Sequence, residues 1–105
     1  MNVTQLGEVA GRRYPAGRHT QPLVGSGLPI EAAGFCMGHV TLDPNGGQVP
    51  WHSHPNEEAY LMLEGSAELA LGQELRTLVA GDCVYIPPGV YHQLTNRGAE
   101  PVRFL

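Results

Sequence analysis

Glycine and proline interrupt this chain so often that a long helix has no room to form. Fourteen Gly and nine Pro are spread over 105 residues, and almost no window keeps the apolar spacing of an amphipathic helix. Between the interruptions stand short apolar runs, separated by turn sequences such as LDPNGG, EGS, LGQ, AGD and PPG. Short apolar runs bounded by turn residues are typical of β-strands. The sequence therefore predicts an all-β protein.

Ten strands are expected along the chain. They cover residues 12–14, 21–24, 35–42, 48–52, 58–64, 67–71, 74–79, 83–86, 91–95 and 101–105. The connections are too short for helical crossovers, so the strands should pair antiparallel in a sandwich or barrel. One hairpin is expected at residues 69–75, around Gly72-Gln73. At this length we expect one domain, residues 1–105, with one core.

Charge and hydropathy exclude several classes of protein. The net charge is −4, and the longest basic run is Arg12-Arg13, which argues against a nucleic-acid partner. No apolar run is long enough for a membrane span, and the N-terminal residues lack the order of a secretion signal, so we expect a cytoplasmic protein. Cys36 and Cys83 lie in separate apolar runs, and we expect buried, reduced thiols there instead of a disulfide or a nucleophile.

Histidines and glutamates gather in the stretch WHSHPNEEAY, residues 51–60. Side chains alternate faces along a strand, so His52 and His54 point the same way. Glu58 shares their parity and Glu57 does not, which favours Glu58 as the carboxylate that turns inward. The bend expected at Pro55-Asn56 can interrupt this alternation.

A further histidine follows a rigid turn in the stretch GDCVYIPPGVYHQLTN, residues 81–96. His92 begins a strand just after Pro87-Pro88-Gly89, and a barrel could bring it opposite His52 and His54. Three imidazoles and one carboxylate suit a divalent first-row metal: iron, manganese, nickel, copper or zinc. The alternative is that these histidines are surface groups or hydrogen-bonded core groups.

Both stretches resemble the signature motifs of the cupin superfamily. The first motif matches at Gly46, His52, His54, Glu58 and Gly65. The second motif matches at Gly81, Pro87, Gly89, His92 and Asn96. The spacer between them, residues 66–80, is near the minimum of that family, as in small single-domain microbial cupins.

The resemblance implies a double-stranded β-helix, which is an antiparallel jelly-roll barrel. It also implies that His52, His54, Glu58 and His92 bind the metal inside the barrel. A homodimer with N-terminal strands packed between the subunits is a further implication. Four protein ligands on an octahedral metal would leave two positions for water, dioxygen or a chelating substrate.

Strand parity also indicates the walls of the pocket. Tyr60 and Met62 follow Glu58 on its face of the strand, and Leu94 follows His92. This predicts a mostly apolar pocket with one phenol, that of Tyr60, able to orient a substrate or donate a proton. The alternative for Tyr60 is a purely packing role in the core.

Five other aromatic or charged residues are expected to lie outside the metal site. Trp51 has the opposite parity to His52, so it should pack outside the barrel or at a subunit contact. His39 is expected to be a hydrogen-bonded or rim histidine and not an extra ligand. We expect surface ion pairs for Arg13, Arg18 and Arg76. The alternative is that they hold a carboxylate substrate near the mouth of the pocket.

The leading functional hypothesis is a metal-dependent enzyme that binds a small organic substrate. Iron would indicate a dioxygenase, whereas nickel, manganese or zinc would indicate an isomerase, lyase or cyclase. The alternative is a non-catalytic module that captures a sugar or sugar acid. A storage role ranks third because it would not need the histidines and the carboxylate.

Overall fold

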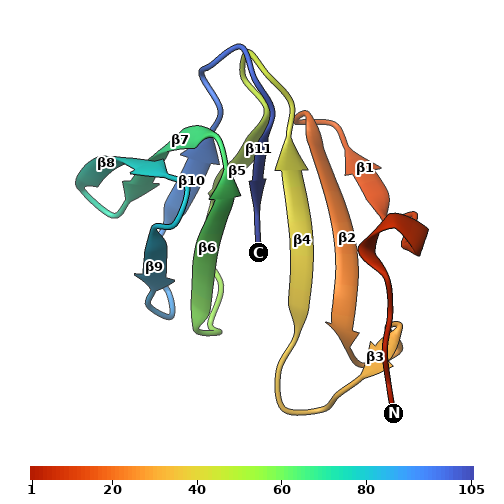
Figure 1. Cartoon of the computed structure of the whole chain (residues 1–105). Helices are drawn as coiled ribbons and strands as arrows, with labels where there is room; N and C mark the ends of the chain where they lie inside the picture. The colour runs from red at the N-terminus through yellow and green to blue at the C-terminus, as the bar shows by residue number, and fades with distance from the viewer.

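The structure, a computed structural model, describes residues 1–105 and consists of short strands joined by tight turns (Figure 1). A 3₁₀ turn, η1 (Leu6–Glu8), precedes the strands. The strands are β1 (Arg12–Tyr14), β2 (Arg18–Gly25), β3 (Ile30–Glu31), β4 (Met37–Leu42), β5 (Gln48–His52), β6 (Glu58–Glu64), β7 (Ser66–Leu71), β8 (Glu74–Val79), β9 (Cys83–Ile86), β10 (His92–Thr95) and β11 (Val102–Phe104).

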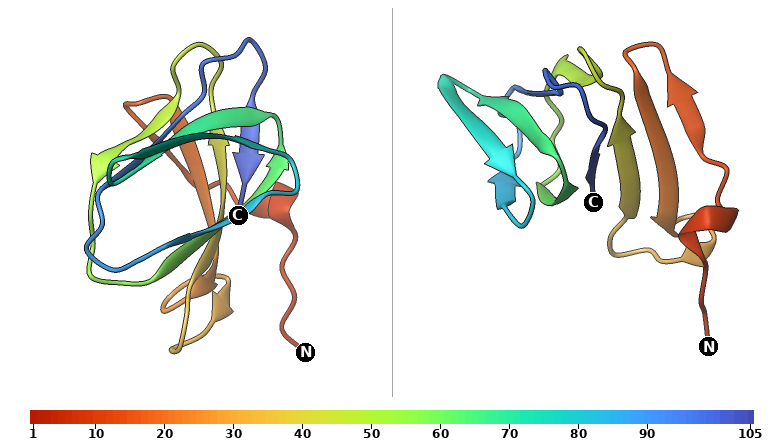
Figure 2. Two further views of the ribbon diagram at one scale, coloured as in Figure 1. Left: turned by 90° about the vertical axis from the view of Figure 1, so that its left-hand side faces the viewer. Right: turned by 45° about the horizontal axis from the view of Figure 1, so that its top comes forward.

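Two sheets make up the fold. Six strands of the seven-stranded sheet follow the order β1-β2-β4-β11-β6-β9, with β3 paired to β2, and the four-stranded sheet has the order β5-β10-β7-β8. From β4 onward the chain passes back and forth between the sheets, and Figure 2 shows the resulting barrel from the β8 side and from above. The expected all-β jelly-roll architecture is confirmed.

The core lies between the two sheets. Period-two alternation along β6 explains it: Tyr60 and Met62 are buried, whereas Leu61 and Leu63 between and beyond them are exposed. The buried apolar cluster consists of Leu42, Val49, Tyr60, Met62, Ala67, Leu69, Leu78, Ile86, Leu94, Val102 and Phe104. Alternate residues of both sheets therefore supply one shared interior.

Strands form in all ten expected places, with differences at some boundaries. Strand β2 begins at Arg18 and not at residue 21, because β1 folds back on it with Tyr14 opposite Arg18 and Arg12 opposite Thr20. Gly17, with φ 71°, allows the turn between them. The sequence did not predict η1 or β3, and β3 pairs parallel with β2, an exception to the expected antiparallel pairing. No helix of the structure is long and apolar enough to cross a membrane.

The expected burial of the cysteines is wrong. Cys36 and Cys83 are both exposed, although both are free thiols as expected. Cys36 precedes β4 in an exposed connection. Cys83 begins the edge strand β9 opposite Leu61, whose side chain faces outward. Apolar neighbours in sequence did not bury these thiols, because Cys36 lies in an exposed connection and Cys83 begins an edge strand.

Candidate metal centre

Segments from both sheets bring four side chains together. His52 ends β5, His54 lies in the following bend, Glu58 begins β6, and His92 begins β10. Antiparallel pairing of β5 and β10 places His52 directly opposite His92, with ring centroids 4.3 Å apart. The His54 ring lies 5.4 Å from that of His52 and 5.1 Å from that of His92.

Backbone carbonyls orient all three imidazoles. The Nδ1 atoms of His52 and His92 lie 2.7 Å and 2.9 Å from the carbonyl oxygens two residues earlier in the chain, and Nδ1 of His54 lies 3.0 Å from the Asn56 carbonyl oxygen. A carbonyl only accepts, so each Nδ1 carries a proton and donates it. A neutral imidazole held in this way presents its Nε2 lone pair, which is the atom that binds a metal.

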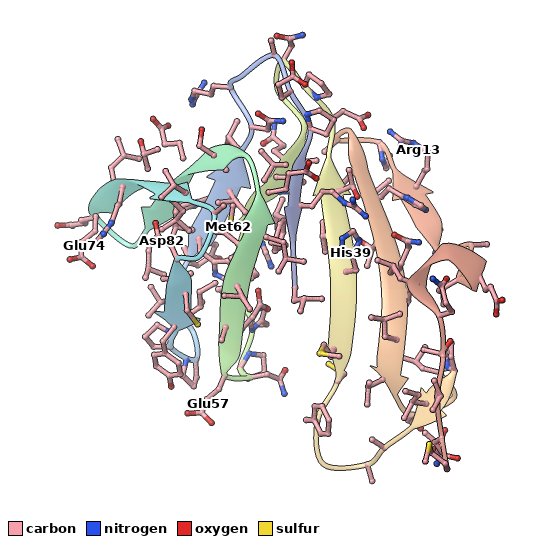
Figure 3. The ribbon with its side chains drawn as sticks, in the orientation of Figure 1. Arg13, His39, Glu57, Met62, Glu74 and Asp82 are labelled. Atoms are coloured by element: carbon pink, nitrogen blue, oxygen red, sulfur yellow. The ribbon has the colours of Figure 1, made fainter.

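The carboxylate of Glu58 closes the cluster. Its Oε2 lies 2.7 Å from Nε2 of His54, and its Oε1 lies 3.9 Å from Nε2 of His92. Glu57 lies just before β6 and is exposed (Figure 3), and it accepts a 2.7 Å hydrogen bond from Tyr85. The bend at residues 55–56 therefore leaves Glu58 on the histidine side.

A cation fits this set of donors. His92 is fully buried, and one ligand atom from each of the three histidines lies within 4.8 Å of the others. The Nε2 atoms of His54 and His92 are buried and form no hydrogen bond, although Oε2 of Glu58 lies 2.7 Å from Nε2 of His54. Two electron-rich atoms this close repel unless a proton or a cation lies between them. Imidazole and carboxylate donors suit a divalent transition metal.

The predicted pocket residues are buried beside the cluster. Met62 and Leu94 are essentially inaccessible, and Tyr60 is 5% exposed. The ring centroid of Tyr60 lies 6.4 Å from that of His92 and 4.8 Å from that of Phe104. Burial raises the pKa of the Tyr60 phenol, and the nearby Glu58 carboxylate raises this pKa further. The phenol therefore remains a proton donor at neutral pH.

Two other aromatic positions lie outside the cluster. Trp51 is half exposed on the outer wall and stacks on Tyr91, with ring centroids 5.6 Å apart. His39 is buried on the opposite sheet, and its Nδ1 lies 3.1 Å from the side-chain oxygen of Gln21. Both outcomes agree with the sequence, which predicted an outward tryptophan and a hydrogen-bonded histidine that is not an additional ligand.

The three arginines differ from one another. Arg13 forms the expected surface ion pair, a close contact with Asp43. Arg18 pairs with no carboxylate; its guanidinium lies 4.1 Å from the Tyr14 ring centroid, and its Nε is buried without a partner. The expectation of an ion pair is also wrong for Arg76, which lines a cavity instead. Strand register places Arg18 opposite Leu42 and Arg76 opposite Leu69, and Arg76 is exposed in a lining that also contains Glu74 and Asp82.

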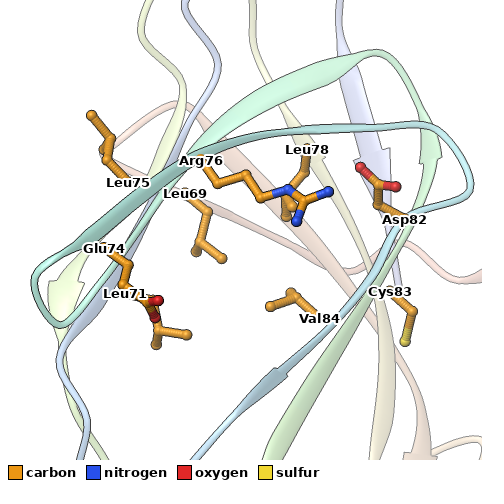
Figure 4. A pocket seen from close by; sticks show the side chains of 9 residues that line it. All are labelled: Leu69, Leu71, Glu74, Leu75, Arg76, Leu78, Asp82, Cys83 and Val84. Carbon is orange, nitrogen blue, oxygen red and sulfur yellow. The ribbon is translucent and has the colours of Figure 1, made fainter.

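That cavity adjoins the cluster but does not contain it. It has a volume of about 410 Å³ and lies between β7, β8 and β9 (Figure 4). Leu71 on its wall lies directly opposite His92, and Val84 lies directly opposite Tyr60. The sequence reasoning missed this cavity, although the predicted hairpin around Gly72-Gln73 already implied which residues face inward.

Known proteins match this chain over most of its length. A stretch of 71 residues is 39% identical to the dimethylsulfoniopropionate lyase DddQ of Ruegeria pomeroyi and covers 67% of this chain and 35% of that protein. The tetracenomycin polyketide synthase protein TcmJ of Streptomyces glaucescens is 35% identical over 72 residues, which cover 68% of this chain and 47% of that protein. The matched segments thus span less than half of these two relatives.

A solved structure shows the same fold over nearly the whole chain. The polyketide cyclase RemF of Streptomyces resistomycificus superimposes with a TM-score of 0.85 and 25% identity, covering 99% of this chain and 75% of that one. The model of the Cupin domain family matches residues 38–105, which include all four residues of the histidine and glutamate cluster. On this match, and on the barrel with its histidine cluster, the chain belongs to the Cupin domain family.

Proposed function

We propose that this protein is a metal-dependent enzyme that acts on a small organic substrate by lyase or cyclase chemistry, with oxygenation as the iron-dependent variant. The observation that carries the proposal is the convergence of three imidazoles and one carboxylate on one point inside the barrel. Three carbonyls hold the rings in this arrangement, so the site is preorganised.

The ligands would be His52, His54, Glu58 and His92. A divalent metal bound there would supply Lewis-acid polarisation of a substrate oxygen or, if it is iron, activation of dioxygen. A purely structural zinc site would use a closed shell, without a neighbouring phenol or cavity.

The protein groups around the ligands have defined tasks. The protonated Tyr60 phenol can hydrogen-bond to a substrate oxygen or deliver a proton to it. Met62 and Leu94 line the interior with apolar surface and exclude water, which strengthens every electrostatic interaction inside.

The names of the relatives support the choice of chemistry. One is a lyase and one is a polyketide cyclase, and both reactions can proceed without a change in substrate oxidation state. The matched segment covers 35% of the lyase, so the transfer of any activity to this chain is part of the proposal. A module that captures sugars has less support, because six of the nine residues that line the adjoining cavity are hydrophobic.

Metal content is the first test. Elemental mass spectrometry of untagged protein should find close to one iron, manganese, nickel, copper or zinc per chain, and a His52→Ala/His92→Ala variant should have lost it. The matched control is His19→Ala, because His19 bonds to the Ala10 carbonyl outside the cluster and its loss should leave the metal in place. A wild type that stays metal-free after reconstitution would refute the proposal.

Tyr60→Phe separates catalysis from packing. The variant keeps the ring against Phe104 and loses only the hydroxyl, so its fold and metal content should not change. With a substrate found by screening lyase and cyclase reactions, kcat should fall by about 10²-fold or more if the phenol transfers a proton. An unchanged kcat would leave Tyr60 as a packing residue only.

A further inference from the structure

The jelly-roll barrel is open along the seam between β8 and β9. Strand β9 ends the seven-stranded sheet and β8 ends the four-stranded sheet, and the two edges do not pair with each other. The cavity of about 410 Å³ lies in this seam. Its volume is in the range of small-molecule sites, which start near 300 Å³.

Apolar side chains form the body of the cavity. Six of its nine lining residues are hydrophobic, and Leu69, Leu71, Leu78 and Val84 project inward from three strands. The burial of a ligand's apolar surface against these side chains would be the main source of affinity. A strongly hydrated ligand such as a sugar would find few hydrogen-bonding groups there.

The lining of the cavity contains one cationic side chain, that of Arg76, and it forms no ion pair. Arg76 lies opposite Leu69 in the β7–β8 pairing, so its side chain projects to the inner face, and Figure 4 shows it extending toward Leu78. No carboxylate is within ion-pairing distance of its guanidinium, whereas Arg97 and Arg103 each face a glutamate.

Neither acidic residue of the lining forms an ion pair with Arg76. Asp82 is engaged elsewhere, because its Oδ2 accepts a 2.8 Å hydrogen bond from the Val79 backbone. Glu74 lies at the tip of the hairpin, opposite Leu71, without an ion pair to Arg76. A guanidinium binds carboxylates with two parallel hydrogen bonds, so it selects for a planar anion.

We propose that the cavity between β7, β8 and β9 binds an organic anion with an apolar body, and that Arg76 is the residue that selects its carboxylate. The inference rests on the proposed function in one respect: it names the class of substrate for the adjoining metal centre. The cavity wall supports this link, because Leu71 and Val84 lie directly opposite His92 and Tyr60 on neighbouring strands.

Three probes of one shape test the proposal. They are 1-naphthoate, the neutral 1-naphthamide and the cationic 1-naphthylmethylammonium, each titrated into wild-type protein by isothermal titration calorimetry. The anion should bind about tenfold tighter than the amide, and the cation should bind least tightly. Equal affinities, or a preference for the cation through Glu74 and Asp82, would overturn the proposal.

Two variants separate the charge from the cavity. Arg76→Gln should abolish the preference for 1-naphthoate while leaving 1-naphthamide affinity within about twofold of the wild type. Val84→Phe, which fills the apolar wall, should weaken both probes. The matched control is Arg97→Gln, since Arg97 pairs with Glu68 away from the cavity, and it should bind all probes as the wild type does. A similar loss of naphthoate binding in both arginine variants would refute a specific role for Arg76.

The metal-ligand variant distinguishes this inference from the proposed function. Binding of 1-naphthoate to His52→Ala/His92→Ala should keep its dependence on Arg76, because the cavity lining contains none of the metal ligands. If the protein prefers 1-naphthoate to 1-naphthamide but never binds metal, the cavity assignment is supported and the metal-dependent function is refuted. Bound metal without any charge preference would refute the cavity assignment alone.

Discussion

At the residue scale, local backbone contacts orient the histidines of the candidate metal site. Two of the three Nδ1 acceptors lie two residues before their histidine, Pro50 for His52 and Val90 for His92. The local chain therefore sets which ring nitrogen is protonated. Asn96, the last residue of the second motif, acts over a longer range and connects three segments.

Replacement of Asn96 should destabilise the fold. Its side-chain amide donates to the carbonyls of Leu42, Asp43 and Glu100, and its oxygen accepts from the Gly98 N–H. Asn96→Ala would leave buried polar groups unpaired, so we expect a loss of about 3 kcal/mol in urea unfolding. The exposed change Asn2→Ala is the control, and a loss within experimental error of that control would contradict the expectation.

His39 should make stability depend on pH. Burial, with Arg103 and His19 nearby, lowers the pKa of His39 below its ordinary 6.5, and Glu64 lies in the same surface cleft. The unfolded chain then binds the proton more readily, so the contribution to stability is complete above about pH 6.5 and is lost as the pH falls toward the folded-state pKa.

The variant His39→Gln should remove this part of the pH dependence, while glutamine still offers Gln21 a donor. Urea unfolding between about pH 7.5 and 5.5, with chelator present in both proteins, measures it. We expect the wild type to lose more stability than the variant over this range. Parallel curves would show that His39 titrates alike in both states.

At the element scale, the turn between β6 and β7 depends on the absence of a side chain. Gly65 has φ 80°, and a Cβ there would lie 2.8 Å from the Pro101 carbonyl oxygen. Gly65→Ala should therefore cost about 2 kcal/mol or more in unfolding free energy.

Gly81→Ala is the matched control for that turn. Gly81 has φ 92° with open space around it, so alanine there should cost only the backbone strain, about 1 kcal/mol. The difference in unfolding free energy between the two variants measures the clash of the added Cβ with Pro101 and Val102. Equal losses would show that the turn relaxes away from Pro101.

Period-two alternation was the most informative signal at this scale. It correctly identified Tyr60, Met62 and Leu94 as buried. The burial expected of Cys83 rested on its apolar neighbours in sequence and not on alternation, and Cys83 is exposed opposite the outward-facing Leu61.

At the scale of the whole molecule, the histidine and glutamate cluster draws its side chains from both sheets. His52 and His92 belong to the four-stranded sheet, whereas Glu58 belongs to the seven-stranded sheet. A metal bound by all of them would stabilise only the folded state, because the unfolded chain does not hold the ligands together.

Removal of metal should therefore lower Tm. With free metal a hundredfold above its Kd, chelation should lower Tm by roughly 10 °C in a chain of this size. Differential scanning calorimetry with and without EDTA measures the change, and the His52→Ala/His92→Ala variant should not respond. A Tm that chelation lowers equally in both proteins would place the stabilising metal elsewhere. The predicted homodimer is a separate expectation, which light scattering tests directly.

The sequence by itself determined the strands, the turns and the chemistry of the ligands. Strand propensity, turn residues and side-chain alternation act within a few residues, so they are readable without a partner strand. These local rules identified the histidines and Glu58, and the resemblance to cupins supplied the barrel.

Only the tertiary structure decided what the strands enclose. The pairing of His52 with His92, the exposure of the cysteines and the unpaired guanidinium of Arg76 all depend on strands that are distant in sequence. The open seam between β8 and β9 depends on the order of strands in both sheets. Packing of remote segments against one another sets these features, and no local pattern encodes which remote segments will meet.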